Sequence, residues 1–154
     1  PRIPGLEKSI EACDYLYGKE VGDKVIIIGG GLTGCEIAYD LFKKGKTPII
    51  VEMKNDLIAV KGVCLANSSF LRDFFELNKV EVHLETSLVK VTDSGVVVRD
   101  KNGKEFEIAG DSVIASMGYH PKPALEGAKL GGECKKVGNL RTVVWGAWKG
   151  AKKM

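Results

Sequence analysis

The sequence lacks the paired cysteines that mark most metal and redox motifs. Its four cysteines, Cys13, Cys35, Cys64 and Cys134, are far apart, and none belongs to a CxxC pair. This spacing excludes the usual zinc, iron–sulfur and dithiol motifs, so no metal site is predicted. We interpret all four as unpaired thiols of a protein in the reducing cytoplasm.

Long apolar runs and a strong charge bias are also missing. No hydrophobic stretch reaches the roughly 20 residues that a membrane-spanning helix needs, and we recognise no signal peptide. The net charge is only +3, and the basic residues are scattered apart from a lysine-rich tail. The sequence therefore predicts neither a membrane protein nor a nucleic-acid-binding one, and it carries no signal for an oligomeric state.

The composition that remains is that of an ordinary globular domain. The chain has 154 residues, of which 44% are hydrophobic and 28% charged. This length suits a single domain with its own core, so we expect one domain over residues 1–154. Because the first residue is proline and not methionine, we also expect the chain to be a piece of a longer protein.

The most informative stretch opens with a β-branched apolar run at residues 25–28. A glycine-rich turn and a helical pattern follow it, and a second apolar run at residues 49–51 ends in Glu52. The glycines at GxGxxG spacing are Gly29, Gly31 and Gly34. A strand, a glycine turn, a helix and a second strand that ends in an acid form the pattern of a dinucleotide-binding βαβ unit.

Each part of this unit has a physical role. Gly29 permits the tight turn after the strand, Gly31 lets a pyrophosphate approach the backbone, and Gly34 lets the helix pack closely on the strand. The helix that begins near Leu32 points its free N–H groups and its positive dipole end at the phosphates. Glu52, at the tip of the second strand, can accept hydrogen bonds from an adenosine ribose.

The residues around Glu52 also bear on the choice of nucleotide. A carboxylate repels the 2′-phosphate of NADPH, which favours NADH. Lys54 weakens this argument because a nearby cation can accommodate the phosphate, but no arginine lies in residues 53–60. NADH is therefore the predicted ligand and NADPH the less favoured one.

The rest of the pattern predicts the order of the elements. The expected segments are a linker with a short helix (1–23, helix 6–17), a βαβ core (24–84), a β-meander (85–110) and a last strand with the C-terminal segment (111–154). Within the core we expect a helix at 68–78 and strands at 48–51 and 80–84, with an irregular stretch at 53–64. Hairpin turn sequences separate meander strands at 88–92, 95–99 and 105–109, and the last strand is expected at 111–117.

A final helix is predicted over residues 139–150. Asn139 is expected to cap it, and Trp145 and Trp148 are expected to form a packing face rather than a cofactor site. His83 and His120 are interpreted as structural residues, since neither has neighbours typical of a catalytic or metal site.

Four parts of the chain resemble a known family. They are VIIIGGGLTGCEIA, IIVEM, the meander, and SVIASMGYHP, and they are similar to the NAD(P)H-binding domain of the FAD/NAD(P)-dependent pyridine nucleotide oxidoreductases. The resemblance covers almost the whole chain. It is strongest to the C-terminal region of the old yellow enzyme-type NADH:flavin oxidoreductases, the group of 2,4-dienoyl-CoA reductase and enoate reductase. It implies an α/β, Rossmann-like FAD/NAD(P)-binding fold of three ββα layers, a parallel sheet with helices on one side and the antiparallel meander on the other.

The resemblance also assigns cofactor contacts to individual positions and no catalytic residue to this chain. The pyrophosphate would lie against Gly29, Gly30, Gly31, Leu32, Thr33 and Gly34. The adenosine ribose would lie against Glu52, Met53 and Lys54. In addition, Leu88 would lie near the adenine, Glu36 would approach the nicotinamide, and Met117 and Gly118 would close over the cofactor.

In this family NAD(P)H gives hydride to FAD, and electrons pass through an iron–sulfur cluster to FMN, which reduces an activated alkene. This chain has no second glycine-rich unit for FAD, and the usual Gly-Asp near the end appears as Gly138-Asn139. The resemblance therefore places FAD, FMN and the cluster in a parent protein. The partners of this chain would be the FAD-type domain and the flavin barrel of that parent, and the chain alone would bind NADH without turnover.

Two other classes of protein remain open. One is a structural module that keeps ADP or NAD without redox turnover, as in the trimethylamine dehydrogenase branch. The other is a self-contained FAD-binding protein, which would be yellow when purified.

Overall fold

The computed structural model describes residues 3–59, 64–122, 125–127 and 130–152. The chain forms two compact units, Pro1–Met117 and Gly118–Met154. The sequence, which predicts one domain over residues 1–154, gives no signal for a boundary at Gly118.

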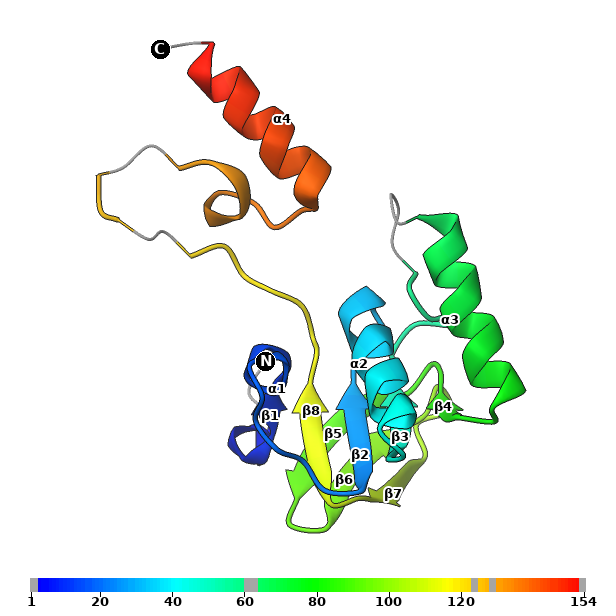
Figure 1. The fold of residues 1–154 in the computed structure, drawn as a ribbon. Coiled ribbons are helices and arrows are strands. Elements are labelled where there is room, and N and C mark those ends of the chain that lie inside the picture. Colours follow the sequence, from blue (N-terminus) through cyan, green and yellow to red (C-terminus); the bar gives the residue numbers. More distant parts are fainter. Residues whose placement is uncertain (1–2, 60–63, 123–124, 128–129, 153–154) are drawn as a thin grey trace. The chain divides into compact units, whose positions relative to one another are not determined.

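A five-stranded parallel sheet is the centre of the first unit, with the strand order β1-β8-β2-β3-β4 (Figure 1). The strands are β1 (Ile10–Glu11), β2 (Lys24–Ile28), β3 (Thr47–Val51), β4 (Glu81–His83) and β8 (Ser112–Ala115). Four of them were predicted, and β8 and β4 are shorter than expected. Because all five run in the same direction, the loops that leave their carboxyl ends share one edge of the sheet.

The N-terminal region differs from its prediction. In place of one helix over residues 6–17, the chain forms a 3-10 turn, η1 (Leu6–Lys8), then β1, then the short helix α1 (Ala12–Leu16). Ile10 pairs with Ile114 of β8. Leu6 and Ile10 pack against the two opposite faces of the parallel sheet, which one continuous helix does not allow. The helical spacing of the apolar residues was therefore misleading.

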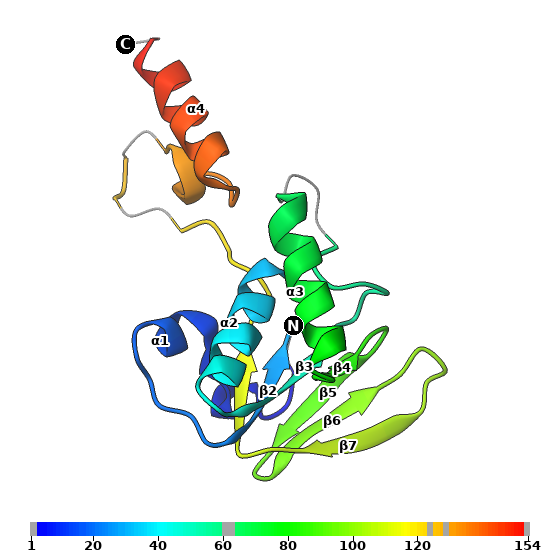
Figure 2. The ribbon, with the colours of Figure 1, turned by 45° about the vertical axis from the view of Figure 1, so that its right-hand side comes forward.

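Three helices cover one face of the parallel sheet (Figure 2). They are α1, α2 (Leu32–Lys43) and α3 (Leu65–Leu77). The core on this side contains Val25, Ile27, Ile37, Ala38, Leu41, Ile50, Leu71, Phe75 and Ile114. The helix α3 begins three residues before the predicted start at residue 68. Asn67 and Ser68, the two residues that could have capped a helix starting there, both lie inside α3, and the Ser68 hydroxyl donates to the Leu65 carbonyl.

The antiparallel meander covers the other face of the parallel sheet. Its strands are β5 (Ser87–Thr92), β6 (Gly95–Arg99) and β7 (Glu105–Ala109), which closely match the prediction. The core between the two sheets contains Ile26, Ile28, Ile49, Val51, Val91, Val96, Val98, Ile108 and Val113. Alternate residues of β2 point to opposite cores, which explains why this strand is apolar throughout. The predicted three-layer ββα fold is confirmed.

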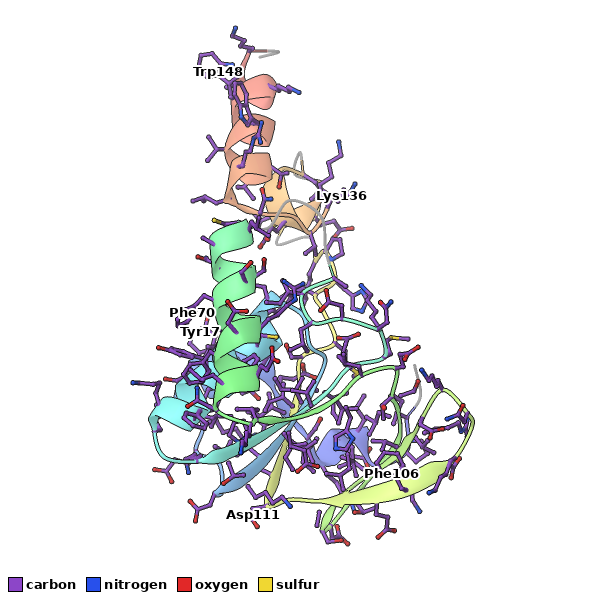
Figure 3. The ribbon with its side chains drawn as sticks, turned by 90° about the vertical axis from the view of Figure 1, so that its right-hand side faces the viewer. Tyr17, Phe70, Phe106, Asp111, Lys136 and Trp148 are labelled. Carbon is purple, nitrogen blue, oxygen red and sulfur yellow. The ribbon has the colours of Figure 1, made fainter. Side chains whose placement is uncertain are left out.

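The second unit contains a 3-10 turn, η2 (Gly132–Cys134), and the helix α4 (Leu140–Ala151). Asn139 caps α4 as predicted, because its side chain accepts from the Thr142 amide at 3.0 Å. No residue of α4 is buried. Trp145 and Trp148 are half exposed, so the predicted packing face does not form part of a core here (Trp148 is labelled in Figure 3).

Candidate dinucleotide site at the carboxyl end of the sheet

Two glycines of the glycine-rich motif, Gly29 after β2 and Gly34 in the first turn of α2, are required by the fold itself. Gly29 has a φ of +111°, and a Cβ added to it would lie 2.2 Å from the Ser116 carbonyl oxygen. A Cβ on Gly34 would lie 2.0 Å from the Gly29 oxygen. The tight turn at Gly29 and the close helix packing at Gly34 are therefore confirmed as the structural reasons for these residues.

Gly31 differs from both. It lies directly before α2 with a φ of −69° and a ψ of 179°, a conformation that any residue can adopt. An added Cβ would meet no atom within 4 Å. The fold does not require a glycine at this position, but a bare backbone here leaves space for a ligand.

The start of α2 presents unpaired backbone donors. Within the described ranges, the amides of residues 31–34 donate to no protein group, whereas the Gly29 amide donates to the Val51 carbonyl and the Cys35 amide donates to the Gly31 carbonyl. Four consecutive amides at the positive end of a 12-residue helix are the type of donor group that an anion such as phosphate accepts from.

Glu52 joins this loop to the end of β3. Its side chain is 8% exposed, and its Oε2 accepts from the Gly30 amide at 2.6 Å. Its Oε1 accepts from the Lys54 amide at 2.8 Å. The sequence predicted an acid that faces a ribose but missed the bond to the glycine loop. A carboxylate offers about four lone-pair sites, so acceptor capacity for ribose hydroxyls remains.

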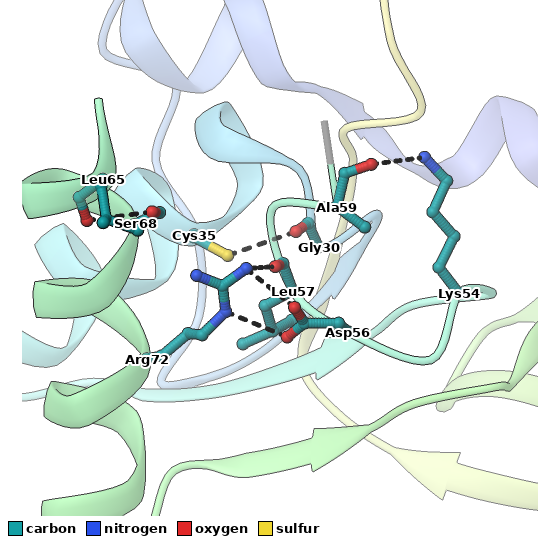
Figure 4. Close-up of polar contacts among 9 residues, drawn as sticks. All are labelled: Gly30, Cys35, Lys54, Asp56, Leu57, Ala59, Leu65, Ser68 and Arg72. Atoms are coloured by element: carbon teal, nitrogen blue, oxygen red, sulfur yellow. Dashed lines mark hydrogen bonds and ion pairs between the residues drawn. The ribbon is translucent and has the colours of Figure 1, made fainter. Parts of the chain in front are cut away.

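A turn at residues 56–58 covers the other side of the glycine loop (Figure 4). Ile58 donates its amide to the Gly30 carbonyl at 2.7 Å, and Leu57 and Ile58 are both buried. Arg72 of α3 binds the Asp56 carboxylate through Nε and Nη2, each at 2.9 Å. From the sequence, only an irregular segment at 53–64 was predicted, of which residues 60–63 lie outside the described part, and nothing in the pattern indicated a role for Arg72.

Cys35 lies under the same loop, and its thiol donates to the Gly30 carbonyl at 3.4 Å. Burial, with a smaller contribution from the negative charge of Glu52, raises the pKa of this thiol to about 12. The thiol is therefore protonated at neutral pH, and we assign it a packing role. All four cysteines are free, as expected from their spacing.

The other residues predicted to contact the cofactor differ in their exposure to solvent. Met53 and Lys54 are exposed beside Glu52, and Glu36 is exposed on α2. Leu88 packs, partly buried, against the core between the sheets. Thr86, two positions before Leu88, donates its amide to the Glu52 carbonyl at 3.0 Å, so the start of β5 lies beside Glu52.

Met117 and Gly118 lie where the two units meet in sequence. Met117 is 45% exposed and follows Ser116, whose carbonyl lies against Gly29. Gly118 begins the second unit, with a φ of +95°. The structure thus gathers the residues of the glycine loop, Glu52 and the β8 end at one edge of the sheet.

The described residues contain neither a cluster of metal ligands nor a membrane-spanning helix. Among residues 3–59, 64–122, 125–127 and 130–152, no group of three or more His, Cys, Asp or Glu side chains could hold a metal ion. No helix in this described part is long and apolar enough to cross a membrane.

Comparison with known proteins identifies the family and the fold. Residues 1–146 match the family described as pyridine nucleotide-disulphide oxidoreductase. The chain belongs to this family. The resemblance noted from the sequence is confirmed, and the chain is a dinucleotide-binding domain of a pyridine nucleotide oxidoreductase.

Two relatives and one solved structure show how much larger the related proteins are. Cinnamate reductase from Clostridium sporogenes is 41% identical over 160 residues, which cover 97% of this chain and 24% of the relative. NADH oxidase from Thermoanaerobacter brockii is 34% identical over 144 residues, with 89% and 21% covered. The structure of 2-naphthoyl-CoA reductase has a TM-score of 0.85 at 23% identity, covering 97% of this chain and 24% of that one. The chain spans about a quarter of the length of these proteins.

Proposed function

We propose that the chain binds NADH at the carboxyl end of its parallel sheet and holds the nicotinamide for hydride transfer to a flavin in a parent protein. The observation that carries this proposal is the row of four unpaired amides at residues 31–34 beside the carboxylate of Glu52.

The diphosphate is the part of the ligand that the described geometry fits best. Gly31 leaves open space where an added Cβ would meet nothing within 4 Å. The adjacent amides of Leu32, Thr33 and Gly34 have no other acceptor among the described residues. Two negatively charged phosphates would accept these hydrogen bonds and gain from the helix dipole.

The adenosine ribose would lie against Glu52. The carboxylate is held by the Gly30 and Lys54 amides, so its remaining lone pairs are fixed in direction. These lone pairs can accept from ribose hydroxyls, but they repel the charge of a 2′-phosphate. Lys54 offsets part of this repulsion, but no arginine, the residue best suited to bind a 2′-phosphate through two hydrogen bonds, lies in residues 53–60. NADH is therefore favoured over NADPH.

Bound NADH would supply the hydride, and this chain would supply its position. We assign the nicotinamide to Glu36 on α2 and closure over the cofactor to Met117 and Gly118 after β8. Met53 and Lys54 are assigned to the adenosine ribose with Glu52, and Leu88 to the adenine. Glu36 and Met117 are exposed, so both are accessible to a ligand. No residue of the chain is assigned a role in acid–base or nucleophilic chemistry.

The parent protein would be a flavoenzyme of the enoate or 2,4-dienoyl-CoA reductase type. The 41% identity to cinnamate reductase supports this type of enzyme. That relative is about four times longer than the region it shares with this chain, which supports further domains in the parent. We assign FAD, FMN and an iron–sulfur cluster to a FAD-type domain and a flavin barrel of the parent, with an activated alkene as the final acceptor.

Titration calorimetry of the chain with NADH, NADPH, ADP and FAD tests the proposal. We expect NADH to bind more tightly than NADPH, because of Glu52, and more tightly than ADP, because the nicotinamide half adds contacts. Equal affinities for NADH and ADP would support a structural ADP module. A yellow sample with flavin absorbance, or no heat with any nucleotide, would overturn the proposal.

A further inference from the structure

We propose that Arg72, which lies on α3 outside the glycine loop, is a positioning residue for nucleotide binding. It would act by holding the turn at residues 56–58 against Gly30. This inference rests on the proposed function, since it concerns the affinity of the same site.

The first step is a two-pronged contact between Arg72 and the turn. The guanidinium Nε and Nη2 each donate to a different oxygen of Asp56 at 2.9 Å. Nη2 also donates to the Leu57 carbonyl at 2.5 Å. A planar fork that binds a carboxylate and a carbonyl together fixes the direction of the turn better than a single charge does.

The turn needs such support because of the backbone at Ile58. Its φ is +52°, in the left-handed region. A β-branched residue in this conformation costs about 1–3 kcal/mol, so it persists only where the surroundings impose it. The contacts of Arg72 with the two preceding residues are well placed to impose it.

The second step is the contact between this turn and Gly30. Ile58 donates its amide to the Gly30 carbonyl at 2.7 Å. A Cβ added at Gly30 would lie 2.6 Å from Cδ2 of Leu57 and 2.9 Å from Cβ of Glu52, so these side chains enclose the glycine. With its amide bound to Glu52, both polar groups of Gly30 are fixed.

The third step leads to the ligand. The Gly30 carbonyl and the Gly31 amide belong to one peptide plane, so the bond from Ile58 sets the direction of the Gly31 N–H, the first of the amides without a partner among the described residues. Arg72 would therefore change the affinity for a diphosphate without touching it. A direct electrostatic role of Arg72 makes a different prediction, because Asp56 would then oppose binding of an anion.

The test measures NADH affinity by calorimetry and amide hydrogen exchange at Ile58 in the chain with R72Q, R72K and D56N. R99Q is the matched control: Arg99 also donates to a carboxylate through Nε and Nη2, in its case to one oxygen of Glu105 in the meander, with side chains 52% and 44% exposed against 32% and 52% for Arg72 and Asp56. Urea unfolding shows that each variant is folded.

We expect R72Q to weaken NADH binding about tenfold and to speed exchange at Ile58, with R99Q unchanged in both. R72K should restore affinity only in part, because an ammonium lacks the fork. D56N should also weaken binding, although it removes a negative charge near an anionic ligand.

Three results would overturn the inference. They are unchanged exchange at Ile58 in R72Q, faster exchange with unchanged NADH affinity, and tighter binding by D56N. The exchange measurement needs no nucleotide, so a failure of the inference is distinguishable from a failure of the proposed function, in which the unmodified chain itself binds no NADH.

Discussion

The two ends of the parallel sheet differ in whether the backbone amides beside them have hydrogen-bond partners. At the amino end, Asp111, labelled in Figure 3, accepts from the amides of Asp23 and Lys24 at 3.2 and 2.8 Å. The Ser112 hydroxyl accepts from the Gly22 amide at 2.9 Å. At the carboxyl end, Glu52 accepts from the Gly30 amide, but the next four amides have no partner in the described part of the chain.

At both ends a carboxylate accepts from backbone amides. Only at the amino end do all the neighbouring amides, those of residues 22–24, have a partner among the described residues. At the amino end the bonds of Asp111 and Ser112 satisfy three consecutive donors and hold β8 against β2. At the carboxyl end the loop is held in place while its outer donors stay free. The proposed function accounts for this difference: the amino end has its donors satisfied for stability, and the carboxyl end keeps donors for a ligand.

The sharpest test of this comparison is G31V. The new side chain would meet no protein atom at Cβ, so the free energy of unfolding should change by less than about 1 kcal/mol. It would fill the space where the diphosphate is expected, so NADH affinity should fall by about 100-fold or more. Calorimetry measures the NADH affinity, and urea unfolding measures the stability.

G34V is the matched control variant. Its new Cβ would lie 2.0 Å from the Gly29 oxygen, so this substitution should destabilise the fold. Unchanged NADH affinity in G31V would contradict the comparison.

E52Q should affect both stability and binding. A glutamine offers one acceptor oxygen where the carboxylate accepts from two amides, so one buried donor loses its partner. We expect the free energy of unfolding to fall by about 2 kcal/mol. NADH affinity should also fall, and the preference for NADH over NADPH should shrink because the negative charge is gone. If E52Q kept both its stability and its preference, Glu52 would have neither of the roles assigned to it.

D111A should affect stability alone. Its bonds to the Asp23 and Lys24 amides are exposed, so we expect the free energy of unfolding to fall by about 1 kcal/mol. NADH affinity, measured in the same buffer as for E52Q, should not change. A drop in affinity as large as that of E52Q would show that the two ends are not separate in function.

The smallest effect concerns Cys35 and appears only at alkaline pH. Its pKa in the folded chain is raised to about 12 from the ordinary 9.0. Above pH 9 the unfolded chain loses this proton while the folded chain keeps it, so stability falls between about pH 9 and pH 12. At pH 9.5 the expected loss is no more than about 1 kcal/mol.

The comparison of the unmodified chain with C35S isolates this contribution from those of lysines and tyrosines. A serine hydroxyl can still donate to the Gly30 carbonyl, so stability near pH 7 should change little. The decline in stability from pH 8 to pH 9.5 should be shallower in C35S. Identical pH profiles would show that the thiol is not held in its protonated form by the fold.

The sequence predicted the fold where local signals and tertiary packing agree. The meander strands were predicted nearly to the residue, since each has β-branched residues between hairpin turns such as Asp93-Ser94-Gly95. The helix over residues 6–17 was wrong because apolar spacing does not reveal on which side of a sheet each residue packs. There Leu6 and Ile10 pack on opposite faces.

The candidate site was predicted only as far as its motif extends. The spacing of Gly29, Gly31 and Gly34 indicated a phosphate-binding turn, and the structure explains each glycine in a different way. The bond from Gly30 to Glu52 and the support from Arg72 were missed. Both join residues that are distant in sequence, and their geometry depends on the completed sheet and on α3.

Amide chemical shifts of the chain, followed by NMR as NADH is added, test the central claim most directly. The unpaired amides of residues 31–34 should show the largest shift changes, and those of Gly22, Asp23 and Lys24 at the amino end should stay in place. Absence of shifts at residues 31–34 under saturating NADH, or equal shifts at both ends, would contradict the account.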